Sequence, residues 1–171
     1  MRNPNSQIDL RRLSAADAAL YRGIRLEALA QHPDAFSSAY ETENAEPLRW
    51  FAERLEHSDV FGAFRGTALL GVVGFIVQHG PKRAHKGVIW GLYVRPDARR
   101  SGVARRLLEH AIIHARRYVE LVQLTVTSVN QPARQLYASL GFVEYGIEKN
   151  ALKADGRYYD DVLMAKPLGG P

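Results

Sequence analysis

One stretch, residues 88–117, constrains the fold more than any other part of the chain. It begins with a short apolar run, Val88 to Val94, that is rich in β-branched and aromatic residues and stops at Arg95-Pro96, as expected of a buried strand. Apolar residues then recur at helical spacing from Val103 to Ala115, which predicts an amphipathic helix that starts near Ser101. The stretch therefore predicts a buried strand that leads through a tight turn into a helix.

The turn between the strand and the helix has the composition of an anion-binding site. Arg99 and Arg100 carry positive charge there, and the first turn of the helix offers unpaired N–H groups at the positive end of its dipole. Gly102 lacks a Cβ, so a ligand can approach the backbone, and Ala104 keeps the next turn small. Neither GxxxxGK[ST] nor a GxGxxG after a strand is present. We therefore expect a phosphate group to bind at this turn. The alternative is that it is an ordinary solvated surface turn without a ligand.

The composition favours one cytoplasmic domain over residues 1–171, which is long enough to bury a sizeable core. The absence of cysteine excludes disulfides, thiolate catalysis and thiolate metal sites, and no His, Asp or Glu pair has a spacing that predicts a metal. No apolar run approaches the roughly 20 residues of a membrane span. The net charge of +5 suits an anionic partner, and seven arginines between residues 95 and 117 concentrate that charge at a local site.

The order of predicted elements is that of an α/β domain with a mixed sheet. Four helices are predicted: from a capping box at Ser14 and Asp17 to before Pro33, from Pro47 to about Leu55, from Ser101, and over Gln131–Leu140. The acidic segment 34–46 is predicted to be a loop that faces water or a cation. Strands are predicted at Ile8–Leu13, Val60–Arg65, Leu69–Gln78, Val88–Val94, Leu121–Thr127, Phe142–Lys149 and Arg157–Lys166.

Two motifs on these elements carry a family resemblance. The first, Arg or Gln followed by x-x-Gly-x-Gly/Ala at the start of a helix, is met by Arg99, Gly102 and Ala104. The second, Asn-x-x-Ala-x-x-Leu-Tyr-x-x-x-Gly-Phe, is met by Asn130, Ala133, Leu136, Tyr137, Gly141 and Phe142. The sequence resembles the GCN5-related N-acetyltransferase (GNAT) superfamily. The resemblance implies a mixed, mostly antiparallel, twisted sheet of about seven strands, flanked by about four helices, with splayed central strands.

The resemblance also implies where acetyl-CoA, the acyl donor, would bind. Its diphosphate would lie on the backbone N–H groups of residues 100–104, and its pantetheine arm would run along residues 92–94. An amide near Leu92 would polarise the thioester carbonyl. The cofactor-binding residues predicted in this way are Leu92, Tyr93, Val94, Arg99, Arg100, Ser101, Gly102, Val103, Ala104, Asn130 and Tyr137.

Catalytic roles follow from the same resemblance. Tyr137 is predicted to protonate the departing thiolate, although its helical spacing with Ala133, Leu136 and Leu140 also fits a core aromatic. Asn130 is predicted to cap the helix that follows it and to contact the cofactor or substrate backbone. A glutamate that many relatives carry on the fourth strand has no counterpart in residues 90–94, so the general base stays open. The candidates are Glu27, also predicted to contact substrate, and Glu41, Glu43, His85, Asp160 and Asp161.

These observations predict a transferase, an acetyl-CoA-dependent N-acetyltransferase that acts on a primary amine of a small or amino-acid-like molecule. A protein N-terminal or lysine acetyltransferase and a non-catalytic acyl-CoA-binding regulator are the alternatives. Nucleic acid is not an expected partner, because the apolar face of the predicted helix at 103–115 needs a buried neighbour and no companion helix adjoins it. No membrane partner is expected, and a homodimer is expected because dimers are common in the family.

Overall fold

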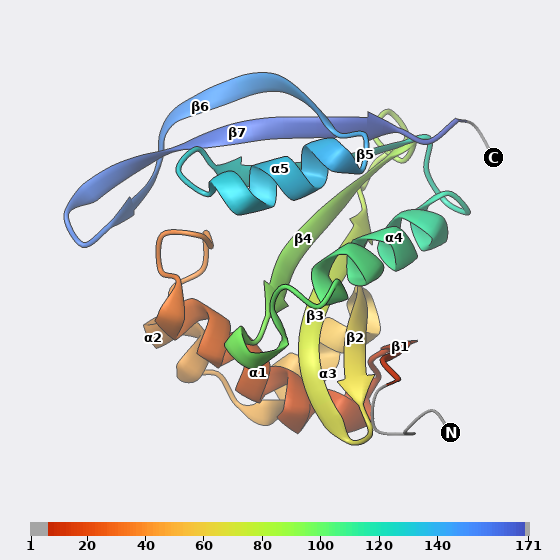
Figure 1. Ribbon diagram of the computed structural model, residues 1–171, viewed down its shortest axis with the longest axis vertical. Coiled ribbons are helices and arrows are strands. Elements are labelled where there is room, and N and C mark those ends of the chain that lie inside the picture. Colours follow the sequence, from red (N-terminus) through yellow and green to blue (C-terminus); the bar gives the residue numbers. More distant parts are fainter. Residues whose placement is uncertain (1–6, 170–171) are drawn as a thin grey trace.

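The computed structural model describes residues 7–169, which form a seven-stranded sheet in the order β1-β2-β3-β4-β5-β7-β6 (Figure 1). All neighbouring strands are antiparallel except β4 and β5, so the predicted mixed, mostly antiparallel sheet is confirmed. The strands are β1 (Asp9–Arg12), β2 (Asp59–Arg65), β3 (Ala68–Val77), β4 (Lys86–Val94), β5 (Leu121–Thr127), β6 (Val143–Ala154) and β7 (Arg157–Pro167). The helices are α1 (Ala18–Gln31), α2 (Tyr40–Asn44), α3 (Leu48–His57), α4 (Val103–Ala115) and α5 (Gln131–Ser139).

The two central strands separate after a short paired stretch, which confirms the predicted splay. Lys86–Val88 of β4 pair with Leu121–Gln123 of β5, and no pairing between these strands follows within the described residues. Figure 1 shows β4 running away from β7, the other neighbour of β5. The edge of β4 beyond Val88 therefore has free backbone groups beside the opening.

A bulge interrupts β4 next to this opening. Gly91 and Leu92 both lie opposite Val73 of β3, because the register shifts between Val72 and Gly74. Gly91 has φ +63, a left-handed conformation that glycine adopts without steric cost. Bulges of this kind redirect a strand and its backbone groups, and they are frequent beside active sites.

Each face of the sheet has its own core. On one face α4 packs on β2, β3 and β4 through Leu107, Leu108 and Ala111, and this core also contains Tyr137. On the other face α1 and α3 pack on the sheet through fully buried residues such as Ile24 and Phe51. Within residues 7–169 no helix is long and apolar enough to cross a lipid bilayer.

Local signals in the sequence set most element ends. The Ser14–Asp17 capping box is present, but it opens a 3-10 turn at residues 15–17 that leads into α1. Asn130 caps α5 as predicted, because its side chain accepts a hydrogen bond of 3.2 Å from the Ala133 amide. The helix predicted from Ser101 begins only at Val103, since Gly102 has φ +83 and ends the preceding turn.

The acidic segment is not the loop that the sequence predicted. Residues 40–44 form the short helix α2, and the side chain of Glu43 is only 3% exposed. The aperiodic sequence gave no helical signal here. The helix instead positions Glu43 to bind two arginines of the chain, Arg25 and Arg54. The interpretation of this segment as water-facing was therefore wrong at Glu43, and the cation it faces belongs to the protein itself.

Candidate active site

The turn before α4 presents a row of free backbone amides. Within the described residues the backbone amides of residues 100–105 donate no hydrogen bond. The Arg106 amide is the first that does, to the Gly102 carbonyl at 3.0 Å. A Cβ at position 102 would have no atom within 4 Å, so this position opens onto free space and needs glycine for its φ angle. This phosphate cradle, residues 99–104, fits an anion such as a diphosphate.

The side chain of Arg99 braces the phosphate cradle. Its Nε donates a hydrogen bond of 3.0 Å to the Val94 carbonyl at the end of β4, and one Nη lies 3.0 Å from the His32 Nε2. Ser101 ties the turn further, because its hydroxyl donates a 2.6 Å hydrogen bond to the Ala98 carbonyl. The free amides are therefore held in place before any ligand arrives.

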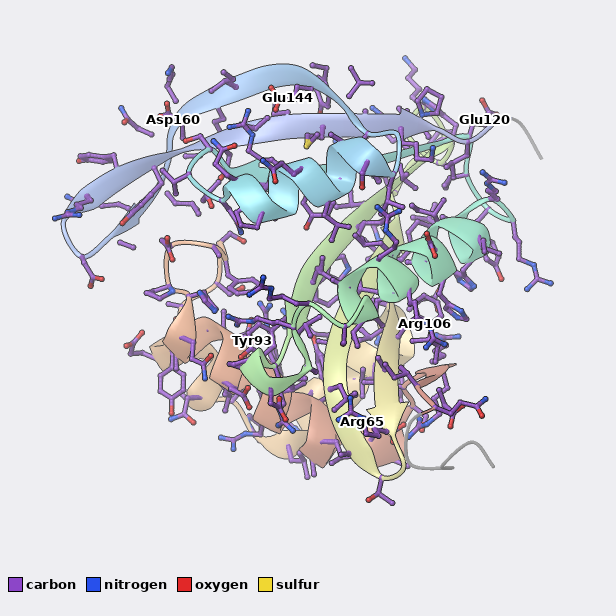
Figure 2. All side chains as sticks on the ribbon, in the orientation of Figure 1. Arg65, Tyr93, Arg106, Glu120, Glu144 and Asp160 are labelled. Carbon is purple, nitrogen blue, oxygen red and sulfur yellow. The ribbon has the colours of Figure 1, made fainter. Side chains whose placement is uncertain are left out.

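Glu27 lies in a network that joins α1 to the end of β4. Its carboxylate accepts hydrogen bonds from the Tyr93 hydroxyl (2.9 Å) and the Arg95 Nε (3.0 Å), and the Tyr93 hydroxyl lies 2.9 Å from a Gln31 oxygen. Figure 2 labels Tyr93 at this end of β4. Burial, and then Glu27, raise the pKa of Tyr93 to about 12. Both carboxylate oxygens of Glu27 are engaged, and its predicted role as a substrate contact stays a prediction.

Tyr137 on α5 is buried to 8% exposure and packs edge-on against Phe142, with ring centroids 5.9 Å apart. Its hydroxyl makes no hydrogen bond with the described residues. Burial raises the pKa of Tyr137 to about 12, so the group is a neutral hydrogen-bond donor over the physiological range.

A cavity of about 310 Å³ lies at the opening between β4 and β5. Residues 88–91 of β4 and residues 125–127 of β5 line it, so the cavity lies between the two strands. Its size is at the lower end of the range for small-molecule sites. The other lining residues are Arg25, Ala35, Phe36, Ser37, Ser38, Arg54, Leu152 and Asp161.

A buried ion cluster forms one wall of this cavity. Arg25 of α1 donates to both oxygens of Glu43 through Nε (3.0 Å) and Nη2 (2.8 Å), and Arg54 of α3 donates to the same carboxylate at 3.1 Å. The sequence reasoning missed both arginines. A signal for Arg25 was present, because it follows Tyr21 by four residues and so lies on the buried face of α1.

Removing the charge of Glu43 is expected to destabilise the fold. Burial opposes ionisation of Glu43 most strongly, but Arg25 and Arg54 outweigh it and hold its pKa below the ordinary value. Glu43→Gln should lower the free energy of unfolding by about 3 kcal/mol, because the buried guanidinium of Arg25 and the partly buried one of Arg54 lose their counter-charge. In the wild type this contribution is present above the unfolded carboxyl pKa and is lost as pH falls. Chemical denaturation of the variant measures it, with the exposed Glu41→Gln as the control. Equal stability of the two variants would contradict this account.

Asp161 of β7 also lines this cavity. It pairs in register with Thr127 of β5 and with Glu148 of β6. Burial, and then the charge of Glu148, raise the pKa of Asp161 above its ordinary value. A carboxylate of this kind is better suited to accept a proton near neutral pH than a fully solvated one.

The other predicted bases lie elsewhere. Asp160 is bound by Lys149 at 2.8 Å and by the Asn150 amide at 2.9 Å, and Figure 2 labels it on the β6–β7 hairpin. His85 is exposed in the turn before β4, and Glu43 is held by its two arginines.

Glu41 lines a second, more open groove of about 570 Å³ that adjoins the cavity. The groove shares Phe36, Ser37, Ser38 and Leu152 with the cavity and lies between the α1–α2 segment and the β6–β7 hairpin. In Figure 1 the α1–α2 segment rises toward this hairpin. An elongated ligand in the cavity would continue into the groove.

Free backbone amides in the turn before α4, beside two splayed central strands, are the features that the resemblance implied for an acyl-CoA-dependent transferase. The family comparison agrees with this class. The profile of the acetyltransferase (GNAT) family matches residues 25–142, which contain the phosphate cradle and Tyr137. The chain belongs to this family, whose acyl donor is acetyl-CoA.

Individual relatives differ in their acceptors. The [ribosomal protein bS18]-alanine N-acetyltransferase of Escherichia coli strain K12 is 36% identical over 84 residues, 48% of this chain and 57% of that protein. The phosphinothricin N-acetyltransferase of Alcaligenes faecalis is 32% identical over 109 residues, 62% of this chain and 55% of that protein. The matched stretch thus spans little more than half the length of these relatives.

Solved structures support the fold over nearly the whole chain. A GNAT-family acetyltransferase from Streptococcus pneumoniae superposes with a TM-score of 0.84 at 23% identity, over 94% of this chain and 99% of that one. The yncA protein of Salmonella typhimurium, solved with its cofactor acetyl-CoA, superposes with a TM-score of 0.80 at 22% identity, over 97% and 96%. At these identities the likeness concerns the fold alone.

Proposed function

We propose that this protein transfers the acetyl group of acetyl-CoA to a primary amine of a small or amino-acid-like molecule, by direct attack in a ternary complex. The observation that carries the proposal is the placement of the acceptor cavity at the opening between β4 and β5, with Asp161 in its wall. The phosphate cradle and membership of the GNAT family support acetyl-CoA as the donor. The chain has no cysteine, so an acetyl-cysteine intermediate is not available to it.

Separate parts of the site bind the diphosphate, the pantetheine arm and the thioester of acetyl-CoA. The free amides of the phosphate cradle hold the diphosphate, and the free edge of β4 binds the amides of the pantetheine arm. The Leu92 amide, beside the Gly91 bulge, donates a hydrogen bond to the thioester oxygen and stabilises the negative charge that develops there. Asn130 caps α5 and so positions Tyr137 on that helix.

Proton transfers complete the reaction. The acceptor ammonium first gives a proton to Asp161, directly or through water, and its nitrogen then forms a bond to the acyl carbon. The carbon–sulfur bond breaks, and the Tyr137 hydroxyl protonates the departing sulfur. The nitrogen loses a second proton, which restores Tyr137, and the proton on Asp161 leaves to solvent. Tyr137 suits this task because burial keeps its hydroxyl protonated.

The role of Asp161 provides the test of this function. Asp161→Asn should lower kcat/KM for the acceptor by roughly 10²-fold at neutral pH, because the ammonium then lacks a base. The deficit should shrink as pH rises toward the pKa of the amine, where solvent deprotonates it. The wild type should lose activity at low pH, because protonation of Asp161 removes the base. Release of free thiol from acetyl-CoA across a pH series measures this effect.

The matched control is Asp160→Asn, which removes a neighbouring carboxylate that does not line the cavity. Equal activity of the two variants at neutral pH would contradict Asp161 as the base. Thiol release that needs no acceptor amine would contradict amine acetylation altogether.

A second candidate function is acetylation of a peptide N-terminus. The open groove of about 570 Å³ next to the cavity favours it, because an extended chain would fit there. The relatives that act on ribosomal protein alanine support the same reading. The predicted homodimer and the cytoplasmic location stay predictions.

A further inference from the structure

We infer that the acceptor carries a carboxylate next to its amine, that is, a free α-amino acid or close analogue, and that Arg25 and Arg54 bind this carboxylate. This inference rests on the proposed function, since it names the acceptor class of the same site. It concerns the ion cluster, which the proton transfers above do not use.

Arg25 has one donor group left over, directed into the cavity. Its Nε and Nη2 are bound to Glu43, whereas its Nη1 makes no hydrogen bond with the described residues. The side chain is only 7% exposed, and Nη1 lies 3.6 Å from where a Cβ of Gly91 would stand. A buried guanidinium thus presents a free N–H group at the bulge of β4, beside the opening.

Arg54 adds a second guanidinium to the same wall. It donates a hydrogen bond from Nη1 to Glu43. Its other donors make no hydrogen bond within the described residues, and the buried Tyr21 hydroxyl lies near the guanidinium. Its guanidinium carbon lies 4.3 Å from the ring centroid of Trp50 and 5.5 Å from that of Trp90. Contact with two indole rings limits the positions that this side chain can take, so its free donors are preorganised.

The ion cluster carries a net positive charge. Two guanidinium groups share the single carboxylate of Glu43, and their side chains are 7% and 26% exposed. Positive charge that is largely removed from water requires a partner. A ligand carboxylate between the free donors of Arg25 and Arg54 would supply that partner through charge-assisted hydrogen bonds.

The lining of the cavity also contains a group of the complementary sign, the carboxylate of Asp161. A zwitterion fits this arrangement, with its carboxylate at the arginines and its ammonium at Asp161. The cavity volume of about 310 Å³ suits a molecule of amino-acid size. A peptide N-terminus has an amide where a free amino acid has its carboxylate, and so would leave the arginines unsatisfied.

The test compares each of a set of amino acids with the corresponding amino acid amide, by thiol release from acetyl-CoA. We expect kcat/KM to be roughly 100-fold higher for the free acids, because a buried charge pair of this kind is lost in the amides. Arg54→Met should lower kcat/KM for the acids by a similar factor and leave the amides almost unchanged. This variant keeps the Arg25–Glu43 pair intact, which favours retention of the fold.

Two further variants complete the design. Arg22→Met is the matched control. Like Arg25, Arg22 joins α1 to the α2 segment, here through a hydrogen bond to Asn44, and it lies over the Phe51 ring. It does not line the cavity. The variant should leave both acceptor classes unchanged. Arg54→Lys keeps the positive charge that Arg54→Met removes, but lacks the planar guanidinium. Compared with Arg54→Met, it should recover part of kcat/KM for the free acids and leave the amides unchanged.

Amides or peptides that react as well as free acids, while thiol is still released, would overturn this inference and leave the proposed function standing. An Arg54→Met variant that slows both classes equally would do the same. Failure of every acceptor to release thiol would instead overturn the proposed function, and this inference with it.

Discussion

Replacing Tyr137 by phenylalanine is expected to lower kcat by ~10² to 10⁴ and to leave the dissociation constant for acetyl-CoA almost unchanged. The hydroxyl makes no hydrogen bond with the described residues, so its removal breaks no interaction that holds α5 in place. Phenylalanine keeps the ring and its edge-on contact with Phe142. The loss therefore falls on protonation of the departing sulfur. Initial rates of thiol release, together with isothermal titration of CoA, measure the two effects separately.

The pH dependence gives a second readout for Tyr137. Its pKa of about 12 means that the wild-type hydroxyl stays protonated up to strongly alkaline pH, so this acid should not cause a fall in rate near pH 8 or 9. Tyr145→Phe is the matched control, because Tyr145 is 55% exposed and its hydroxyl accepts a hydrogen bond from Gln123. If the Tyr137→Phe variant were as active as Tyr145→Phe, Tyr137 would be a core aromatic without a catalytic role.

Gly102→Glu is expected to weaken binding of CoA by ~10²-fold or more. The φ angle of +83 at this position costs a non-glycine residue about 1–2 kcal/mol, and the new carboxylate would stand at the phosphate cradle and repel the diphosphate. Because a Cβ at this position meets no atom within 4 Å, the substitution creates no clash in the core. Titration of CoA into the variant measures the loss of affinity.

Two controls separate the charge from the backbone strain. Gly80→Glu places the same side chain at a glycine with φ +92 and open surroundings, in the turn before β4 and away from the phosphate cradle. It should retain wild-type affinity. Gly102→Ala carries the strain without the charge and should show an intermediate loss. Unchanged CoA affinity in Gly102→Glu would mean that the diphosphate binds elsewhere.

The structure of the turn before α4 could be predicted because its signals lie close together in the sequence, whereas binding of a diphosphate there stays a prediction. Within about thirty residues the chain contains an apolar strand, the Arg95-Pro96 pair, a glycine and an amphipathic helix. Each of these can be recognised from neighbouring residues alone. Asn130 as a helix cap is equally local, and both the strand and the helix around it formed as predicted. The splay of β4 from β5 came from the family resemblance, since no local pattern encodes it.

The acceptor cavity could not be predicted in the same way, because it joins residues that are distant in sequence. Arg25, Glu43 and Arg54 come from three helices, one of which formed in a segment without helical periodicity. Asp161 was one of two adjacent aspartates, and only the pairing of β7 with β5 decides which of them faces the cavity. The bulge had a weak signal, a glycine inside an apolar strand, at Gly91.

The most direct test of the central claim is the initial rate of thiol release by the wild-type protein, with acetyl-CoA and the acceptor amine both varied. Direct attack in a ternary complex predicts release that depends on the acceptor, with double-reciprocal lines that intersect. Parallel lines would indicate a covalent acetyl-enzyme and contradict the mechanism. Tight binding of CoA without thiol release on any amine would contradict the enzyme itself and favour a non-catalytic acyl-CoA-binding regulator.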